Sequence, residues 1–159
     1  MKSLEAEDMV PMLRMAADDR IKKTYMLSDL PDREQAEAFF RRLKTLSESD
    51  SHFVYGIYRD GDLIGFLNEC EIDGTNIELG YFISPENWNQ GYAAEALQAA
   101  IDELFRMGFE RVRTGFFEEN KASCRVMEKC GMHLIPDESV IIYRGISHKC
   151  FYCEIMRTG

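Results

Sequence analysis

Residues 77–97 read IELGYFISPENWNQGYAAEAL, and this stretch joins the best-defined strand of the chain to its best-defined helix. The strand has a period of two and stops at Pro85, and an apolar helical stripe opens after Gly91. A glycine and small residues at a helix start leave several backbone N–H groups unpaired, at the positive end of the helix dipole. Such a loop suits a pyrophosphate, although it matches neither the Gly-x-Gly-x-x-Gly nor the Gly-Lys-Ser/Thr pattern.

On both sides of this stretch, the spacing of apolar residues predicts the other elements. A spacing of two indicates a strand, and a spacing of three to four indicates a helix. Two helices are expected upstream, the first interrupted by Pro11 and the second opening at Asp32 and Gln35. An antiparallel meander that passes into a βαβ unit indicates a mixed α+β fold, with a mostly antiparallel sheet and helices on both faces. No linker interrupts residues 1–159, so we expect a single domain. The expected elements span 4–15, 33 to about 47–51, 52–59, 63–72, 76–84, 92–107, 111–119, 120–129, 140–145 and 150–157.

The charge of the chain is uneven. Its 159 residues carry 19 Lys and Arg against 28 Asp and Glu, which gives a net charge of −9. Residues 51–110 contain Arg59 and Arg106 as their only bases, so the acidity belongs to the middle of the chain. A binder of nucleic acid needs clustered cations to displace counterions from phosphates, so nucleic acid is not an expected partner. Cationic partners are favoured by the same argument.

The cysteines indicate a reducing compartment. There are five, an odd number, and the opening MKSLEAEDMV has no basic-then-apolar signal region, so we expect reduced thiols and a cytoplasmic protein. Cys150 and Cys153 form a CxxC pair, but a strand-like context and the lack of a second pair favour a structural role over zinc or redox chemistry. The three histidines are scattered, so no metal is expected. No apolar run approaches the ~20 residues that span a bilayer.

The chain resembles the GNAT N-acetyltransferases, and within them the ribosomal-protein N-acetyltransferase-like branch. The resemblance rests on residues 77–97 together with NKASCRVMEKCGM at 120–132, and it covers about Phe53 to Arg157. The family's Q/R-x-x-G-x-G/A element falls on Trp88 to Ala93. The sequence departs from the branch at Asn89, where glycine is usual, and a non-glycine residue there either crowds the loop or adopts a negative φ.

The resemblance implies that acetyl-CoA binds where the third and fourth strands splay apart. Backbone groups of Tyr81, Phe82 and Ile83 would pair with the pantetheine arm like an added strand. The amides of the loop and first helical turn would hold the pyrophosphate, and these belong to Gln90, Gly91, Tyr92, Ala93 and Ala94.

The second motif implies two further contacts. Asn120 would contact the pantetheine, and Ser123 would lie near the CoA sulfur, where a hydroxyl can donate to a departing thiolate. Many family members have a tyrosine acid where this chain has Met127, so Ser123 becomes the better candidate, or no dedicated acid is needed. Asn120 as a helix cap and Ser123 as a first-turn residue are the structural alternatives.

Glu78 is the candidate base. The family often has a carboxylate at this position of the cleft strand, and an alkylammonium must lose a proton before it attacks a thioester. A partly buried glutamate with a raised pKa could accept that proton. Glu69 and Glu71 alternate on the neighbouring strand and could share the site, and the alternative is that all three form a solvated face.

The start of the chain departs from the family pattern. The family opens with a β-strand, whereas this sequence reaches Glu5-Ala6-Glu7-Asp8 almost at once, so the first strand is expected to be short or missing. That would leave a sheet edge uncovered and favour a homodimer.

Three functions follow as hypotheses. The first is an acetyl-CoA-dependent N-acetyltransferase that acts on a cationic amine, either a small molecule or a protein N-terminus, by direct attack in a ternary complex. The second is a catalytically weak acyl-CoA-binding sensor or scaffold of the same fold, and the third is a redox or metal protein built on Cys150 and Cys153.

Overall fold

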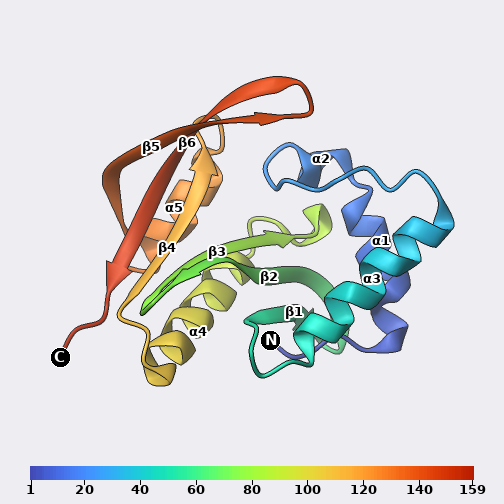
Figure 1. The fold of residues 1–159 in the computed structure, drawn as a ribbon, viewed down its shortest axis with the longest axis horizontal. Coiled ribbons are helices and arrows are strands. Elements are labelled where there is room, and N and C mark those ends of the chain that lie inside the picture. Colours follow the sequence, from blue (N-terminus) through green and yellow to red (C-terminus); the bar gives the residue numbers. More distant parts are fainter. The chain divides into compact units, whose positions relative to one another are not determined.

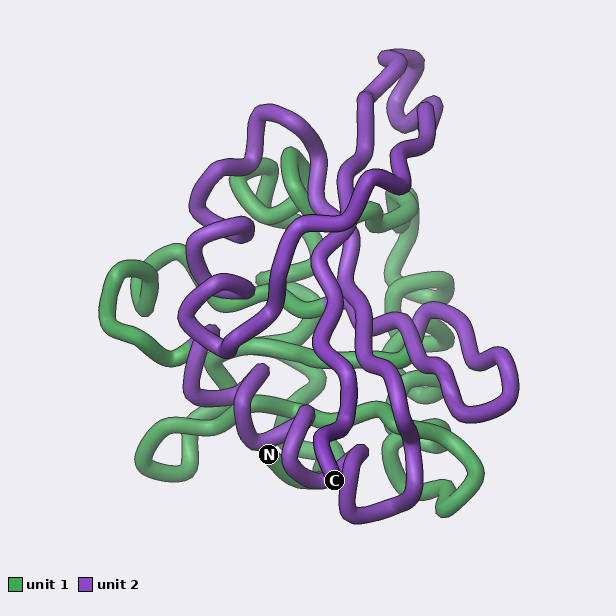
Figure 2. Tube along the Cα trace, turned by 90° about the vertical axis from the view of Figure 1, so that its left-hand side faces the viewer, with its two compact units in different colours: residues 1–69, 81–92 green, residues 70–80, 93–159 purple.

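The computed structural model describes residues 1–159 and divides them into two compact units, coloured separately in Figure 2. The first unit comprises residues 1–69 and 81–92, and the second comprises residues 70–80 and 93–159. The strands β2 (Asp62–Asp73) and β3 (Asn76–Ile83) each run from one unit into the other. The single domain expected from the sequence stays a prediction.

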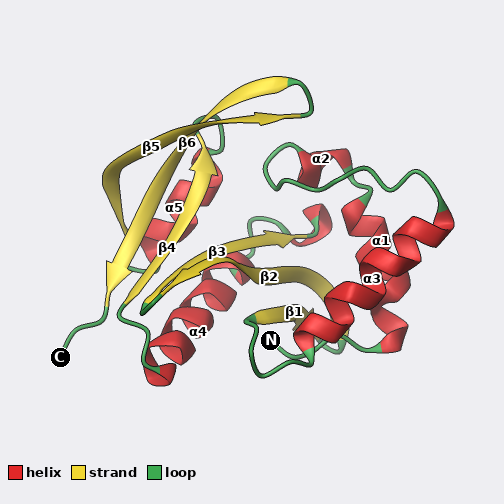
Figure 3. Cartoon of the chain, viewed as in Figure 1, coloured by secondary structure: helices red, strands yellow, loops and turns green.

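The strands confirm the mixed fold class. Six strands follow the order β1-β2-β3-β4-β6-β5, and of the pairs described below only that of β3 with β4 is parallel. Three helices come first in the chain, three strands follow, and α4 and α5 are each followed by strands, as drawn in Figure 3. None of the helices combines the length and the hydropathy that crossing a bilayer requires.

The first unit contains three helices and a hairpin (Figure 1). In the hairpin, β1 pairs antiparallel with β2 from Val54 opposite Asn68 to Arg59 opposite Asp62. Apolar side chains of α1 and α3 pack with those of the hairpin in one buried cluster that includes Met12, Phe40 and Phe66. The elements are α1 (Met9–Ala16), α2 (Asp19–Lys22), α3 (Arg33–Ser47) and β1 (Val54–Arg59), with 3₁₀ turns at Ala6–Asp8 and Pro85–Asn87.

The second unit is a strand–helix alternation that ends in a long hairpin. β3 pairs parallel with β4 from Asn76 opposite Arg111 to Leu79 opposite Thr114, while β6 pairs antiparallel with both β4 and β5. α5 packs against β4 and β6. The elements are α4 (Tyr92–Met107, whose first residue belongs to the first unit), β4 (Arg111–Phe117), α5 (Lys121–Lys129), β5 (His133–Tyr143) and β6 (Ile146–Met156).

Three expectations are corrected at the level of elements. Pro11 does not interrupt the first helix, because it lies in the first turn of α1, where a proline needs no N–H donor. The sequence did not predict α2, which is a single turn capped by Asp18. β5 starts at His133 rather than near Val140, and its pairing shifts register between Leu134 and Glu138, where Pro136 cannot donate to the ladder.

The first strand is reduced to one bridge, as the sequence predicts. Lys2 N donates to Gly56 O at 3.1 Å, and Gly56 N donates to Lys2 O at 2.8 Å. The chain then turns into the 3₁₀ segment at Ala6. β1 is therefore an edge strand over most of its length, and a homodimer at this edge stays a prediction.

We expect the cap of α3 to contribute measurably to stability. The Asp32 carboxylate accepts a hydrogen bond from Gln35 N at 2.8 Å, so Asp32→Ala should lower the free energy of unfolding by about 1 kcal/mol. Asp32→Asn keeps an acceptor and should restore most of that loss, and Arg42→Ala, at an exposed position of α3, is the control. Chemical denaturation measures the difference, and equal stability of the alanine and asparagine variants would contradict the capping role.

Candidate functional site

The loop between β3 and α4 has two residues in the left-handed region. Asn89 has φ +60° and Gly91 has φ +84°, on either side of Gln90. The alternative that Asn89 adopts a negative φ is therefore wrong. Asparagine is among the residues that tolerate this conformation best, because its short amide can hydrogen-bond locally, so it replaces a glycine here without a change of backbone path.

Three hydrogen bonds within the first unit hold this loop. Ser84 N donates to Ile64 O at 2.7 Å, Asn87 Nδ2 donates to Ser84 Oγ at 2.7 Å, and Trp88 Nε1 donates to Ile83 O at 2.6 Å. The loop is thus tied both to its own strand and to β2. Beyond it, a Cβ added to Gly91 would meet no atom within 4 Å, so the space beside this glycine is open.

A cation that the sequence did not single out lies at the same loop. The guanidinium of Arg59, at the end of β1, is 5.5 Å from the ring centre of Tyr92, the first residue of α4. Its Nη1 also donates to Asn87 Oδ1 at 3.5 Å. Arg59 is one of only two bases among residues 51–110, and that scarcity is the signal that could have identified it.

The segment Tyr81–Ile83 is the C-terminal end of β3. The four residue pairs that join β3 to β4 lie in the other half of the strand, at Asn76–Leu79. The Phe82 side chain is 7% exposed and packs in the buried cluster of the first unit, so this part of the strand is firmly placed within that unit.

Glu78 lies in the second unit, in the paired half of β3. Its side chain is 21% exposed. Burial raises the pKa of the Glu78 carboxyl above its ordinary value, the positive charge of Arg113 opposes that rise, and the negative charge of Glu71 adds to it. Glu71 therefore lies close enough to Glu78 to act on it. A half-buried carboxyl with a raised pKa is suited to accepting a proton near neutral pH.

Arg113, on β4, completes a polar cluster around Glu78 that the sequence did not reveal. Arg113 Nε lies 3.2 Å from Glu78 Oε2, but it has no hydrogen-bond partner, so the contact is an ion pair. Its guanidinium lies 4.1 Å from the ring centre of Tyr152, and its Nη1 donates to Asp137 Oδ2 at 3.4 Å. The Tyr152 hydroxyl and Ser139 Oγ share a hydrogen bond of 2.8 Å. Parallel register placed Arg113 opposite Glu78, and register across a crossover helix cannot be read from sequence.

Glu69 makes other contacts than Glu71 and Glu78 do. In the first unit, its oxygens lie 2.6 Å from His52 Nδ1 and 2.8 Å from Phe53 N, which donates to it. These contacts fasten the start of β1 to β2, so Glu69 has a structural role in this unit.

Asn120 caps the start of α5, and its contact with the pantetheine stays a prediction. Its side-chain oxygen accepts a hydrogen bond from Ser123 N at 3.2 Å, which is the N-cap of the helix. Ser123 is partly buried in the first turn, whereas Met127 is fully buried and acts as a core residue. A polar acid at position 127 would be costly in that environment.

The CxxC pair lies within β6. Cys150 and Cys153 are buried and form no disulfide, and burial raises the pKa of Cys150 above its ordinary value and that of Cys153 to about 11. Reactive thiols have lowered pKa values, so these two are unsuited to redox exchange at neutral pH. No group of three or more His, Cys, Asp or Glu side chains is placed to hold a metal ion.

The two units have different chemical features. The first has a loop of backbone N–H groups at a helix start, which suits an anion. The second has a carboxyl with a raised pKa, which suits proton transfer.

Comparisons with known proteins agree on one family. The family model described as Acetyltransferase (GNAT) domain matches residues 1–133. Among curated relatives, the uncharacterized N-acetyltransferase YnaD of Bacillus subtilis is 31% identical over 134 residues, which cover 82% of this chain and 76% of YnaD.

Solved structures have the same fold. A GNAT-family acetyltransferase from Bacillus anthracis superposes with a TM-score of 0.80 at 23% identity, over 98% of this chain and 92% of the other. Spermidine N-acetyltransferase from Vibrio cholerae, in complex with CoA and spermine, gives 0.81 at 17% identity, over 98% and 93%. Ribosomal-protein-S5-alanine acetyltransferase from Vibrio fischeri gives 0.80 at 16%, over 98% and 91%.

The electrostatic balance at Glu78 is testable in the isolated protein. Because Arg113 stabilises the ionised carboxylate, Arg113→Gln should raise the pKa of Glu78 further above its ordinary value. Carbon-detected NMR of labelled glutamate follows the titration. Arg106→Gln, which removes an exposed arginine that pairs with Glu103 on α4, should leave the Glu78 pKa unchanged. A Glu78 pKa that stays constant or falls in the Arg113 variant would contradict this balance.

Proposed function

The chain belongs to the GNAT family of acetyltransferases, and we propose that it transfers the acetyl group of acetyl-CoA to a primary amine by direct attack in a ternary complex. The observation that carries this proposal is the loop at Asn89–Gly91. Two of its residues have left-handed backbone conformations, and α4 begins directly after it. Such a helix start binds phosphate through its unpaired N–H groups and its dipole.

Acetyl-CoA would be held through the contacts that the family resemblance implies. The backbone amides of the loop and of the first turn of α4 would hold the pyrophosphate. These amides belong to Gln90, Gly91, Tyr92, Ala93 and Ala94. The backbone of Tyr81, Phe82 and Ile83 would pair with the pantetheine amides, since the donors and acceptors of an extended strand have the spacing that an added strand requires. Asn120, whose side-chain oxygen caps α5, would contact the pantetheine. Exposed Lys121, Arg125 and Lys129 on α5 would add positive charge for the phosphates.

Glu78 would act as the base. The ammonium form of the amine loses a proton to the Glu78 carboxylate, and the neutral nitrogen attacks the thioester carbonyl. Backbone N–H groups of β3 would polarise that carbonyl. The C–N bond forms and the C–S bond breaks, while the Ser123 hydroxyl stabilises the departing thiolate by a hydrogen bond. The second proton of the attacking nitrogen passes to this thiolate, which leaves as the thiol of CoA. Thiolates leave readily, so the absence of a tyrosine at position 127 is compatible with turnover.

The acceptor would be a cationic amine, either a small molecule or a protein N-terminus. Net charge supports this, because residues 51–110 carry eleven acids and two bases. The named functions of the superposed proteins, which act on spermidine and on a ribosomal protein, span the same two classes. We also expect a cytoplasmic protein, since none of the five cysteines forms a disulfide.

A second candidate is an acyl-CoA-binding sensor with little turnover. The fully buried Met127, at the position of the family's usual acid, favours it. Calorimetry with acetyl-CoA, followed by thiol detection over a panel of amines, separates the two functions. Thiol release that depends on an amine supports the enzyme, binding without release supports the sensor, and no binding would overturn both.

Replacing the base should affect turnover and leave cofactor binding intact. Glu78→Gln should lower kcat by about 10²-fold or more, because general base catalysis contributes 10²–10⁴-fold, whereas the KM for acetyl-CoA should stay unchanged. Glu34→Gln, at an exposed position of α3, is the control. A kcat for Glu78→Gln within twofold of the original, roughly the precision of such assays, would remove Glu78 from the mechanism.

A side chain at Gly91 should weaken binding of acetyl-CoA. Gly91→Ala places a methyl group in the open space beside the loop and strains a residue at φ +84°, so we expect the Kd to rise about tenfold. Gly108→Ala imposes comparable strain at φ +104°, also in open space, at the far end of α4. Calorimetry should find an unchanged Kd in the Gly108 variant, and equal effects of the two variants would argue against a phosphate at Gly91.

A further inference from the structure

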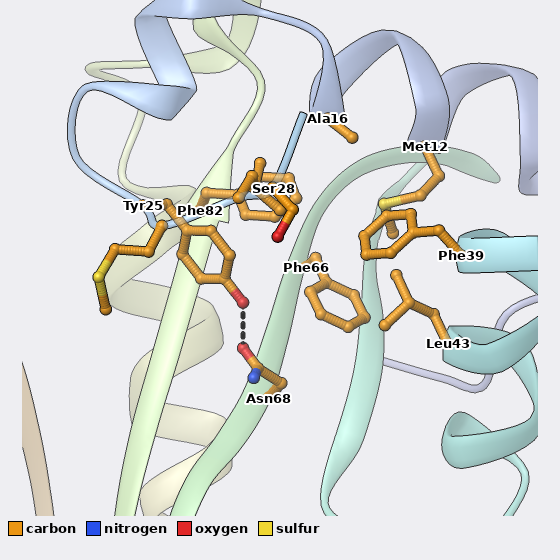
Figure 4. Close-up of a pocket in the computed structure, with 11 residues that line it drawn as sticks. Met12, Ala16, Tyr25, Ser28, Phe39, Leu43, Phe66, Asn68 and Phe82 are labelled. Atoms are coloured by element: carbon orange, nitrogen blue, oxygen red, sulfur yellow. Dashed lines mark hydrogen bonds between the residues drawn. The ribbon is translucent and has the colours of Figure 1, made fainter. Parts of the chain in front are cut away.

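The first unit contains a cavity that the function proposed above does not use. Its volume is about 220 Å³, and α1, α3, β2, β3 and residues 25–28 line it. Figure 4 shows side chains from these elements pointing into a common space, among them Met12, Phe39, Phe66 and Phe82. Ligand sites for drug-sized molecules occupy roughly 300–1,000 Å³, whereas about 150 Å³ suffices for benzene. The cavity therefore fits one group of the size of an apolar amino-acid side chain.

The chemistry of the lining is apolar. No lining side chain carries a charge. Two of the polar lining residues, Tyr25 and Asn68, bond to each other, because the Tyr25 hydroxyl donates to Asn68 Oδ1 at 2.5 Å. The ring centres of Tyr25 and Phe82 lie 4.9 Å apart in an edge-on arrangement, and those of Phe66 and Phe82 lie 5.9 Å apart. The aromatic wall of the cavity is therefore already formed before a ligand binds. A buried ammonium would find no carboxylate here and would lose its hydration without compensation.

The cavity has an accessible rim. Met26 is 52% exposed and Ser28 is exposed, and both contribute to the lining. Methionine is flexible and adapts to apolar ligands of different shape, so this rim can admit a group from solvent.

We propose that this cavity receives the apolar group of the acceptor, which makes the preferred substrate a primary amine with one aromatic or branched aliphatic substituent, and not a polyamine. The inference rests on the proposed function. Phe82 connects the two, because its side chain lines the cavity while its backbone belongs to Tyr81–Ile83, the segment assigned to the pantetheine.

An uncharged probe tests the cavity without catalysis. NMR titration with 2-phenylethanol should show binding to the original protein, and Ala16→Leu should weaken it about tenfold or more by filling the cavity. Ala17→Leu adds the same group at the exposed neighbouring residue and should leave binding unchanged. Ser28→Leu, at the exposed rim, is a second variant that does not disturb buried packing. No binding of the probe, or equal binding by all four proteins, would overturn the inference.

Kinetics test the link to the acceptor. We expect kcat/KM for 2-phenylethylamine to exceed that for ethanolamine about tenfold or more, and that for spermidine likewise. Ala16→Leu should raise the KM for 2-phenylethylamine about tenfold while the KM values for ethanolamine and acetyl-CoA stay constant. A preference for spermidine, or an equal change for both small amines, would overturn the inference.

The two levels of the proposal fail in different ways. Acetylation of amines without any preference for apolar groups contradicts the role of the cavity and leaves the acetyltransferase intact. Probe binding without acetylation of any amine contradicts the proposed function, and the acceptor role of the cavity fails with it.

Discussion

The backbone of the β3–α4 loop is the constraint on which the account depends. Asn89 and Gly91 both have positive φ, so the chain turns sharply here. The Trp88 indole donates to Ile83 O at 2.6 Å, which attaches the loop to the end of β3. This turn leaves the first N–H groups of α4 without intrahelical partners. The proposed contacts of the loop amides with the CoA pyrophosphate follow from that geometry, and Tyr81–Ile83 lies immediately before the loop.

The second constraint is the opposition of burial and charge at Glu78. Burial favours the protonated carboxyl, while the ion pair with Arg113 favours the carboxylate. A base needs both tendencies, because it must be ionised before the reaction and must hold a proton afterwards. Tyr152 and Asp137 fix the Arg113 guanidinium by stacking and by a hydrogen bond, so they set this balance indirectly.

Local patterns predicted much of this structure, and long-range register accounts for what they missed. The apolar stripe of α4, the cap at Asp32 and the turn at Gly91 are encoded within a few residues, so periodicity and turn chemistry were sufficient. Arg113 lies opposite Glu78 because of a parallel pairing 35 positions away in sequence, and the cavity arises where separate helices and strands pack. The φ of Asn89 was also out of reach, because asparagine occupies both signs of φ.

Direct transfer is the central claim, and a single-turnover experiment with labelled acetyl-CoA tests it most directly. In a ternary mechanism, no bond to the acetyl group forms until the amine is present. The protein incubated with acetyl-CoA alone should therefore keep its mass and release no CoA, and the label should appear only in the amine after mixing. Release of CoA before the amine is added, with the label retained on one of the five cysteines or another side chain, would contradict the account.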